Sequence, residues 1–397
     1  RLPEMFNLVK IRGSYSEVGN SIPNKLYNEQ PYDPATGRIQ PATYTGFDHP
    51  LPETVRSVEG GFDLAMFDNS LTMDLTVYSS VMFNQYLPIT SSIGSIKPIN
   101  TGKVRNQGVE ATVSYIFAPS HNFSWKTGVN FSYNDNKILR TYQNRKDIYI
   151  GIGMSDNLRV KFLEGGSYGD MYAKDFTRLK IYDVEKMRAA GNTTAEVGDI
   201  KLSPDGTPSM DAKGGHSVYL GNMNARVNLG WNNTLTWKGL GLYFLIDGKI
   251  GGKVVSFTEA YLDAYGVSQR TADARLSRLT TTVAGETVPA VVMPDGKKAG
   301  AMQYYTTIGD QIFPTEYVYD ATNFRMRELS VSYTFRNLLG AGRDLSTSVV
   351  GRNLFFLYRQ SPVDPDVSLS TQNALGGVDI FGLPSARSLG VNLKVTF

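Results

Sequence analysis

The sequence predicts an all-β protein, an antiparallel β-barrel that crosses a membrane with its strands. Three observations favour this fold class: long runs of alternating apolar and polar residues, aromatic residues toward the ends of those runs, and connections that are alternately short and very long. Several runs reach about ten residues, as a tilted membrane strand requires, whereas soluble strands are mostly about five or six residues long. In such a barrel the apolar face contacts lipid and the polar face lines a wet lumen.

The composition is consistent with this fold class. Charged residues make up 19% of the 397 residues, below the roughly 25% of soluble domains. The formal net charge is 40 − 37 = +3, so nucleic acid is not indicated as a partner. The absence of Cys excludes disulfides and Cys-based zinc sites. No apolar run approaches the roughly 18 residues of a membrane helix.

Alternation along the chain predicts about twelve strands. The polar pair Asp68-Asn69 separates two of the runs and predicts a hairpin. The pair 157–164 and 167–179 is included because it lets every long connection fall on the same side of the membrane. The predicted strands are 6–17, 57–67, 70–83, 106–118, 122–136, 157–164, 167–179, 222–234, 238–251, 324–336, 344–354 and 386–397.

Because successive side chains of a strand point to opposite faces, the alternation also predicts which residues face the lumen. The candidates are Lys10, Arg12, Asp63, Asp74, Glu110, Lys126, Arg226 and Asn228. Each is either a solvated wall residue, paired with its neighbours, or a contact for a substrate that passes through.

The long connections are rich in Tyr, a side chain with a flat apolar face and a polar tip. Such residues suit the recognition of sugar rings or peptides, and they equally suit an interface with a partner protein. The candidates are Tyr27, Tyr32, Tyr44, Tyr261, Tyr265, Tyr304, Tyr305, Tyr317 and Tyr319.

Motifs of catalysis and metal binding are weak in this sequence. Gly165 to Gly169 matches the G-x-S-x-G nucleophile elbow, but no helix follows as the elbow requires, so a glycine-rich turn is expected. Asp364 and Asp366 are candidates for a loop Ca²⁺ site, although Asp-Pro-Asp is more often turn chemistry. No catalytic residue, resident cofactor or other metal site is predicted, and the chain is not expected to be an enzyme.

Short segments spread in order over almost the whole chain resemble one protein family. They are LVKIRGSYSEVGN (8–20), PETVRSVEGGFD (52–63), NQGVEA (106–111), GGSYGDMY (165–172), GDIK (198–201), FRMRELSVSYTF (324–335), GRNLF (351–355) with DPDV (364–367), and residues 383–397. The ordered set resembles the carboxy-terminal part of the SusC/RagA-like TonB-dependent transporters of the outer membrane of Bacteroidetes.

This resemblance implies a barrel of about 22 strands with a plugged lumen, of which residues 1–397 would form the carboxy-terminal portion. The plug domain and the first strands are expected outside this chain, which begins at Arg1 without a signal peptide. The terminal strand, with Leu389, Val391, Leu393, Val395 and Phe397 on one face, resembles the segment that the outer-membrane assembly machinery recognises.

The resemblance also implies a function, namely active import of oligosaccharides or peptides across the outer membrane. A SusD-like surface lipoprotein would act as the lid, and TonB would supply the energy through the amino-terminal region. An alternative is a structural subunit of a larger outer-membrane assembly that does not transport, and a third is a soluble, β-rich secreted protein.

Overall fold

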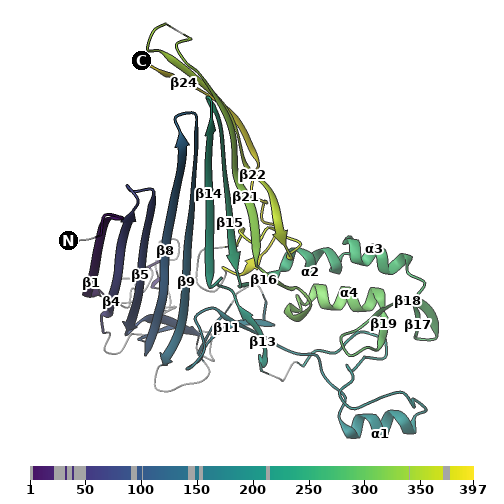
Figure 1. The fold of residues 1–397 in the computed structure, drawn as a ribbon. Coiled ribbons are helices and arrows are strands. Elements are labelled where there is room, and N and C mark those ends of the chain that lie inside the picture. Colours follow the sequence, from purple (N-terminus) through teal and green to yellow (C-terminus); the bar gives the residue numbers. More distant parts are fainter. Residues whose placement is uncertain are drawn as a thin grey trace.

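The computed structural model describes residues 3–21, 32–33, 38–39, 51–90, 96–100, 102–141, 148–151, 155–211, 215–338, 340–369 and 376–397. A tall antiparallel sheet forms most of one side of the molecule (Figure 1). Its ten strands, in spatial order, are β1 (Phe6–Asn20), β4 (Glu53–Met66), β5 (Leu71–Phe83), β8 (Lys103–Ser120), β9 (Phe123–Arg140), β14 (Val227–Trp237), β15 (Leu240–Ile250), β21 (Asn323–Phe335), β22 (Asp344–Arg359) and β24 (Ser388–Thr396).

The predicted alternation of connections is confirmed, with short turns at one end of the sheet and long connections at the other. The turn between β4 and β5 carries Asp68 and Asn69 at φ of 52° and 64°. Between β14 and β15, Lys238 and Gly239 have φ of 48° and 90°, and this two-residue turn with positive φ at both positions matches the right-handed twist of its strands.

Two of the twelve predicted strands are not part of this wall. Within the described residues, 157–164 and 167–179 contribute β11 (Leu158–Phe162) and β12 (Asp170–Ala173) to a separate sheet with β10 (Ile148–Gly151) and β13 (Val218–Asn222). The prediction failed because β9 and β14 pair directly, so the connection between them needs no further wall strand to return to the same side. Leu158, Val160 and Phe162 are buried beneath the loops and do not face lipid.

The long connections fold into structure of their own, including helices that the alternation did not predict. The small strands are β2 (Tyr32–Asp33), β3 (Arg38–Ile39), β6 (Tyr86–Thr90), β7 (Ile96–Asn100), β16 (Lys253–Ser256), β17 (Thr280–Val283), β18 (Glu286–Val292), β19 (Lys298–Gly300), β20 (Val318–Asp320) and β23 (Val378–Asp379). The helices are α1 (Ile181–Ala189), α2 (Phe257–Ala264), α3 (Gln269–Leu276), α4 (Ala301–Asp310) and the 3₁₀ turn Pro314–Glu316. None of these helices is long and apolar enough to cross a membrane.

The main hydrophobic core lies in these connections and not in the wall. Val255, Phe257, Phe313, Tyr317 and Val378 are completely buried there. The outer face of the wall instead exposes large apolar side chains, such as Ile11 at 85% and Leu393 at 72%. That distribution is expected of strands that contact lipid on one face.

Candidate functional site

The strand register places polar residues in continuous rows across one face of the sheet. One row runs over seven adjacent strands: Lys10, Asp63, Asp74, Thr112, Asn130, Gly230 and Asp247. The next row on that face is Arg12, Gly61, Thr76, Glu110, Ser132, Asn228 and Lys249. All the predicted lumen residues that lie within strands therefore share this polar face. Lys126 lies on the same face, nearer the short turns. Arg226 directly precedes β14 and extends the polar face beyond the end of that strand.

Four of the predicted residues contact one another. Lys10 Nζ is 3.2 Å from Asp63, and Arg12 Nη2 lies 3.1 Å from Asp63 and 2.8 Å from Asp74. Arg12 also donates to Thr76 Oγ1 at 3.0 Å. Because these side chains are between 22% and 60% exposed, each pair contributes only about 0–1 kcal/mol to stability.

A groove of about 420 Å³ crosses the middle of the polar face. Asp74, Glu110 and Asn228 line it, together with Asp247 and Lys249, which the sequence prediction did not include. Asp74 is paired with Arg12, Asp247 with Arg327 and Lys249 with Asp366. Among the described residues, Glu110 is therefore the carboxylate of the groove that has no cationic partner. This carboxylate suits ligands that bring hydroxyl or ammonium donors.

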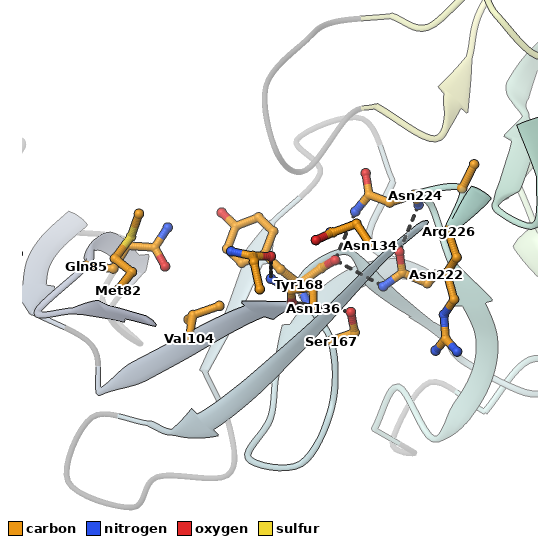
Figure 2. A pocket seen from close by; sticks show the side chains of 12 residues that line it. Met82, Gln85, Val104, Asn134, Asn136, Ser167, Tyr168, Asn222, Asn224 and Arg226 are labelled. Carbon is orange, nitrogen blue, oxygen red and sulfur yellow. Dashed lines mark hydrogen bonds between the residues drawn. The ribbon is translucent and has the colours of Figure 1, made fainter. Parts of the chain in front are cut away.

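A second cavity, of about 210 Å³, lies where the wall meets the loops, and Figure 2 shows its side chains. Its lining is rich in carboxamides, from Asn106, Asn134, Asn136, Asn222 and Asn224, and it also contains Arg226. We call this cavity the mouth pocket. Several of these carboxamides already bond within the pocket: Asn136 donates to Asn106 at 2.8 Å, and Asn222 and Asn224 donate to Tyr168 O at 3.0 Å. Their remaining hydrogen-bonding capacity and the guanidinium of Arg226 are available to a ligand with hydroxyl or amide groups.

The predicted glycine-rich turn forms one wall of the mouth pocket, and the structure confirms that it is a turn. Gly165 and Gly169 have φ of 84° and 96°, and the strand β12, not a helix, begins directly after them. Asp170 accepts from Ser167 N at 2.7 Å. Asn136 Oδ1 accepts from Tyr168 N at 2.7 Å, so the turn is fixed to the end of β9.

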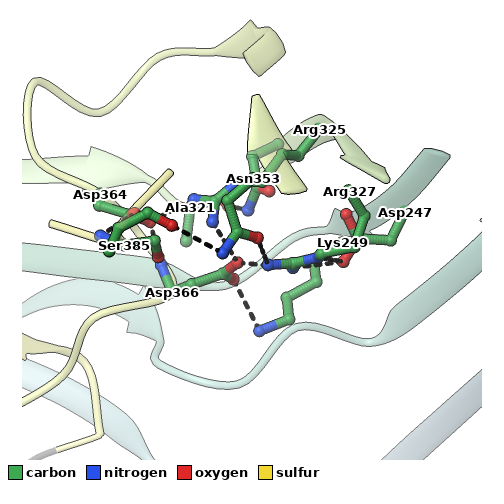
Figure 3. A network of polar contacts seen from close by, with 11 residues as sticks. Asp247, Lys249, Ala321, Arg325, Arg327, Asn353, Asp364, Asp366 and Ser385 are labelled. Atoms are coloured by element: carbon green, nitrogen blue, oxygen red, sulfur yellow. Dashed lines mark hydrogen bonds and ion pairs between the residues drawn. The ribbon is translucent and has the colours of Figure 1, made fainter. Parts of the chain in front are cut away.

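At the loop ends of β15 and β21, an ionic network attaches the connection between β22 and β24 to the wall (Figure 3). Arg325, with a side chain only 2% exposed, donates to Asp364 at 2.6 Å. Asp366 accepts from Lys249 at 2.8 Å and from Arg327 at 3.1 Å. We call this set of residues the anchor.

Asp364 and Asp366, which the sequence offered for a loop Ca²⁺, are thus held by cationic side chains. Burial alone would raise the pKa of Asp364, but hydrogen bonds from Ser385 and the Asp366 backbone, with the charge of Arg325, hold it below its usual value. Lys249 and Arg327 likewise hold the pKa of Asp366 below its usual value against the effect of burial. Among the described residues, no group of three or more His, Asp or Glu side chains is placed to bind a metal ion.

The anchor residues on the wall were missed by the sequence prediction. The predicted strand 324–336 covers Arg325 and Arg327, but its register is irregular between Met326 and Glu328. Such a bulge turns a side chain away from the regular alternation, and Arg327 reaches Asp247 and Asp366 from that position. The signal that could have revealed it is the charged stretch Arg325-Met326-Arg327-Glu328 inside an otherwise amphipathic strand.

Most of the described candidate tyrosines are structural. Tyr317 is completely buried and donates to Asp263 at 2.9 Å, and Tyr304 is 4% exposed. Burial raises the pKa of both phenols well above the ordinary value. Tyr319 is hydrogen-bonded to Glu259, and the ring of Tyr261 stacks on Phe381 at 5.9 Å.

Two of the candidate tyrosines line a cavity between the helices. Tyr265 is 79% exposed, and with Tyr305 and Met302 it lines an apolar cavity of about 540 Å³ between the helices. Tyr305 also lies under the guanidinium of Arg270 at 5.4 Å. Tyr27 and Tyr44 are outside the described residues, and Tyr32 lies in β2, where only the backbone is described.

Comparison with known proteins identifies the family. Residues 5–267 match the sequence profile described as "TonB dependent receptor-like, beta-barrel". TonB-dependent receptor P3 of Formosa agariphila is 24% identical over 369 residues, covering 86% of this chain, and receptor P26 of the same organism is 23% identical over 99% of it. The chain spans 34% and 40% of the lengths of these two relatives.

The solved structures show the same fold. The structure of the RagAB peptide transporter matches the whole chain with a TM-score of 0.70 at 15% identity, and the chain covers 42% of it. The RagAB peptide importer in its "open-open" state matches with a TM-score of 0.65 at 14% identity, where the chain covers 41%. The chain therefore belongs to the TonB-dependent receptor β-barrel family of the outer membrane, as its sequence predicted.

Proposed function

We propose that this chain forms the carboxy-terminal part of the wall of an active importer for oligosaccharides or peptides. The observation that carries the proposal is the continuous polar face, which extends over seven adjacent strands. A polar inner face provides a water-filled passage through an apolar membrane. The rest of the wall, a plug and the TonB-binding segment would come from outside residues 1–397.

In this proposal, the mouth pocket and the groove give the passage an order of contacts. A substrate released from the loops would first meet the carboxamides of the mouth pocket and Arg226. It would then pass the groove at Glu110 and Asn228. No covalent chemistry is involved, and the energy would come from the inner membrane through TonB.

A SusD-like surface lipoprotein is the proposed lid. The similarity in fold to the RagAB peptide transporter supports a two-component importer. The exposed apolar residues Tyr265, Val267 and Met302 beside the apolar cavity support a protein contact at the outer end of the loops, because large exposed apolar patches mark interaction sites.

Uptake of labelled oligosaccharides and peptides by whole cells tests the proposal. We expect uptake of at least one of them to require the intact protein, TonB and the partner lipoprotein, each removed in a separate strain. Uptake that persists without TonB would contradict active import. If uptake stays normal in every strain, and a larger outer-membrane complex is lost when this protein is removed, the result would support the alternative that the protein is a structural subunit.

A further inference from the structure

A cleft of about 630 Å³ lies between two long connections, away from the polar face of the wall. One side consists of α1 and the segment that follows it, from the connection between β9 and β14. The other side is the β17–β19 unit, from the connection between β15 and β21 (Figure 1). We call it the lysine cleft, because Lys186, Lys201, Lys297 and Lys298 all line it.

The two sides of the lysine cleft are fixed to each other. Asp295 Oδ2 accepts from Ile200 N at 2.6 Å, and Lys297 Nζ donates to Thr194 O at 3.2 Å. The buried side chains of Leu179 and Met293 form apolar parts of the lining. The lysines are therefore presented by a preformed cleft and not by independent loops.

The lining residues carry a net positive charge. Four lysines face two carboxylates, Asp183 and Asp199, which gives 4 − 2 = +2 in one cleft of a chain whose total is +3. The ion pairs are long, at 3.4 Å for Lys201–Asp183 and 3.7 Å for Lys297–Asp199.

The acidic groups neutralise this charge only in part. Both carboxylates already accept from backbone N–H groups, Asp183 from Lys180 and Asp199 from Glu196. Lys186 and Lys298 are exposed, and neither forms an ion pair within the described part of the chain.

The side chains also indicate which anion fits. Arginine pairs with carboxylates and phosphates alike through two parallel hydrogen bonds, whereas lysine binds phosphate-type anions as a hydrated point charge without directional demand. The lining contains four lysines and no arginine, with Asn192, Thr194 and Ser203 as neutral hydrogen-bonding groups. This set suits a tetrahedral oxyanion on a hydroxyl-rich carrier, and an acidic peptide is the competing ligand that the binding test distinguishes.

We propose that the lysine cleft binds the sulfate or phosphate ester groups of an anionic oligosaccharide. This inference builds on the proposed import function, because it adds an extracellular capture site and a chemical class of substrate. Binding at this site does not itself require TonB, so it can be tested independently of uptake.

The test is equilibrium binding by the purified, detergent-solubilised full-length protein. The probes are a sulfated tetrasaccharide, a phosphorylated one and the unsubstituted parent sugar. We expect one or both esters to bind more tightly than the parent, and their affinity to fall with added salt, which shortens the range of charge interactions to about 3 Å at 1 M. Equal binding of the parent sugar would overturn the proposal.

Matched variants locate the site. Lys186→Gln with Lys298→Gln removes two exposed charges of the cleft, and we expect ester binding to weaken by at least about threefold, since each exposed contact contributes modestly. Arg336→Gln with Arg343→Gln removes two exposed charges at the short turn between β21 and β22 and should leave binding unchanged. Equal losses of ester binding in the two double variants would overturn the assignment. So would binding of a hexaglutamate peptide that is as tight as binding of the esters. Unchanged circular dichroism confirms the fold of each variant.

Discussion

At the scale of single residues, burial separates the structural charges from the accessible ones. Arg325 and Asp364 in the anchor have side chains that are 2% and 5% exposed, whereas Arg12 and Asp74 on the polar face are 37% and 50% exposed. Removing one member of a buried pair leaves an uncompensated charge away from water, while an exposed partner is readily solvated. The same residue types therefore have different energetic roles within one protein.

Asp364→Asn tests this difference. We expect it to lower the stability of the anchored connection by about 3 kcal/mol, because Arg325 stays buried without a full counter-charge. Asp74→Asn, the control, should cost less than about 1 kcal/mol. Hydrogen exchange of residues 361–369 and 376–387 measures the change; equal protection in both variants would show that the anchor does not hold this connection.

The pKa values of Asp364 and Asp366 also predict how the anchor responds to acid. Both are lowered in the folded protein from an ordinary value of 3.8, so the folded state favours the ionised form. Their stabilising contribution is complete above about pH 3.8 and is lost as pH falls through the lower folded values. We therefore expect protection of residues 361–369 to be unchanged from pH 7 to pH 5, after correction for intrinsic exchange. A loss of protection between pH 7 and pH 5 would contradict this.

The strand period determines which residues share one face of the sheet. Lys10, Arg12, Asp63, Asp74, Glu110 and Asn228 share a face because side chains alternate along a strand, and the register brings them into adjacent rows. The strand period gives no such information about Tyr304 and Tyr317, which lie in the core of the loops. Composition shows that a loop is rich in tyrosine but not which side chains its tertiary packing buries.

At the scale of elements, the wall strands could be predicted and the folded connections could not. β8 and β9 are 18 residues each, and alternation over such lengths is a strong signal. α2, α3 and α4 contain 8, 8 and 10 residues, and helices that short are marginal without tertiary packing. Their formation depends on contacts between segments that are distant in sequence, which a local pattern does not contain.

The crossing of α2 and α4 depends on one such contact. A Cβ atom at Gly309 would lie 2.4 Å from Ala260 O and 2.5 Å from Ala264 N, so only glycine permits this close approach. Gly309→Ala should destabilise the loop core by about 1–3 kcal/mol through overpacking, although alanine favours the helix.

Hydrogen exchange of α2 and α4 measures this effect. Thr306→Ala, at an exposed position of α4, is the matched control and should leave exchange in both helices unchanged. Unaltered protection in the Gly309→Ala variant would show that the two helices can separate at little cost.

At the scale of the whole molecule, the two faces of the wall predict opposite responses to the same substitution. Asn228 lies in the groove on the polar face, and Leu229 is its neighbour on the apolar face, in register with Phe131. If the polar face lines the route of the substrate, Asn228→Trp should obstruct the route and reduce uptake. Leu229→Trp exchanges one apolar side chain for another at the lipid face and should leave uptake unchanged.

Substrate capture at the cell surface separates obstruction from misfolding. We expect the Asn228→Trp protein to reach the outer membrane, to keep the heat-dependent gel mobility of a folded barrel, and to bind substrate as the unaltered protein does, because the substitution lies below the loops. Only the step from surface binding to internal accumulation should slow. Equal uptake by both variants would show that substrates do not pass this part of the wall, and would place the route along another sector of the barrel.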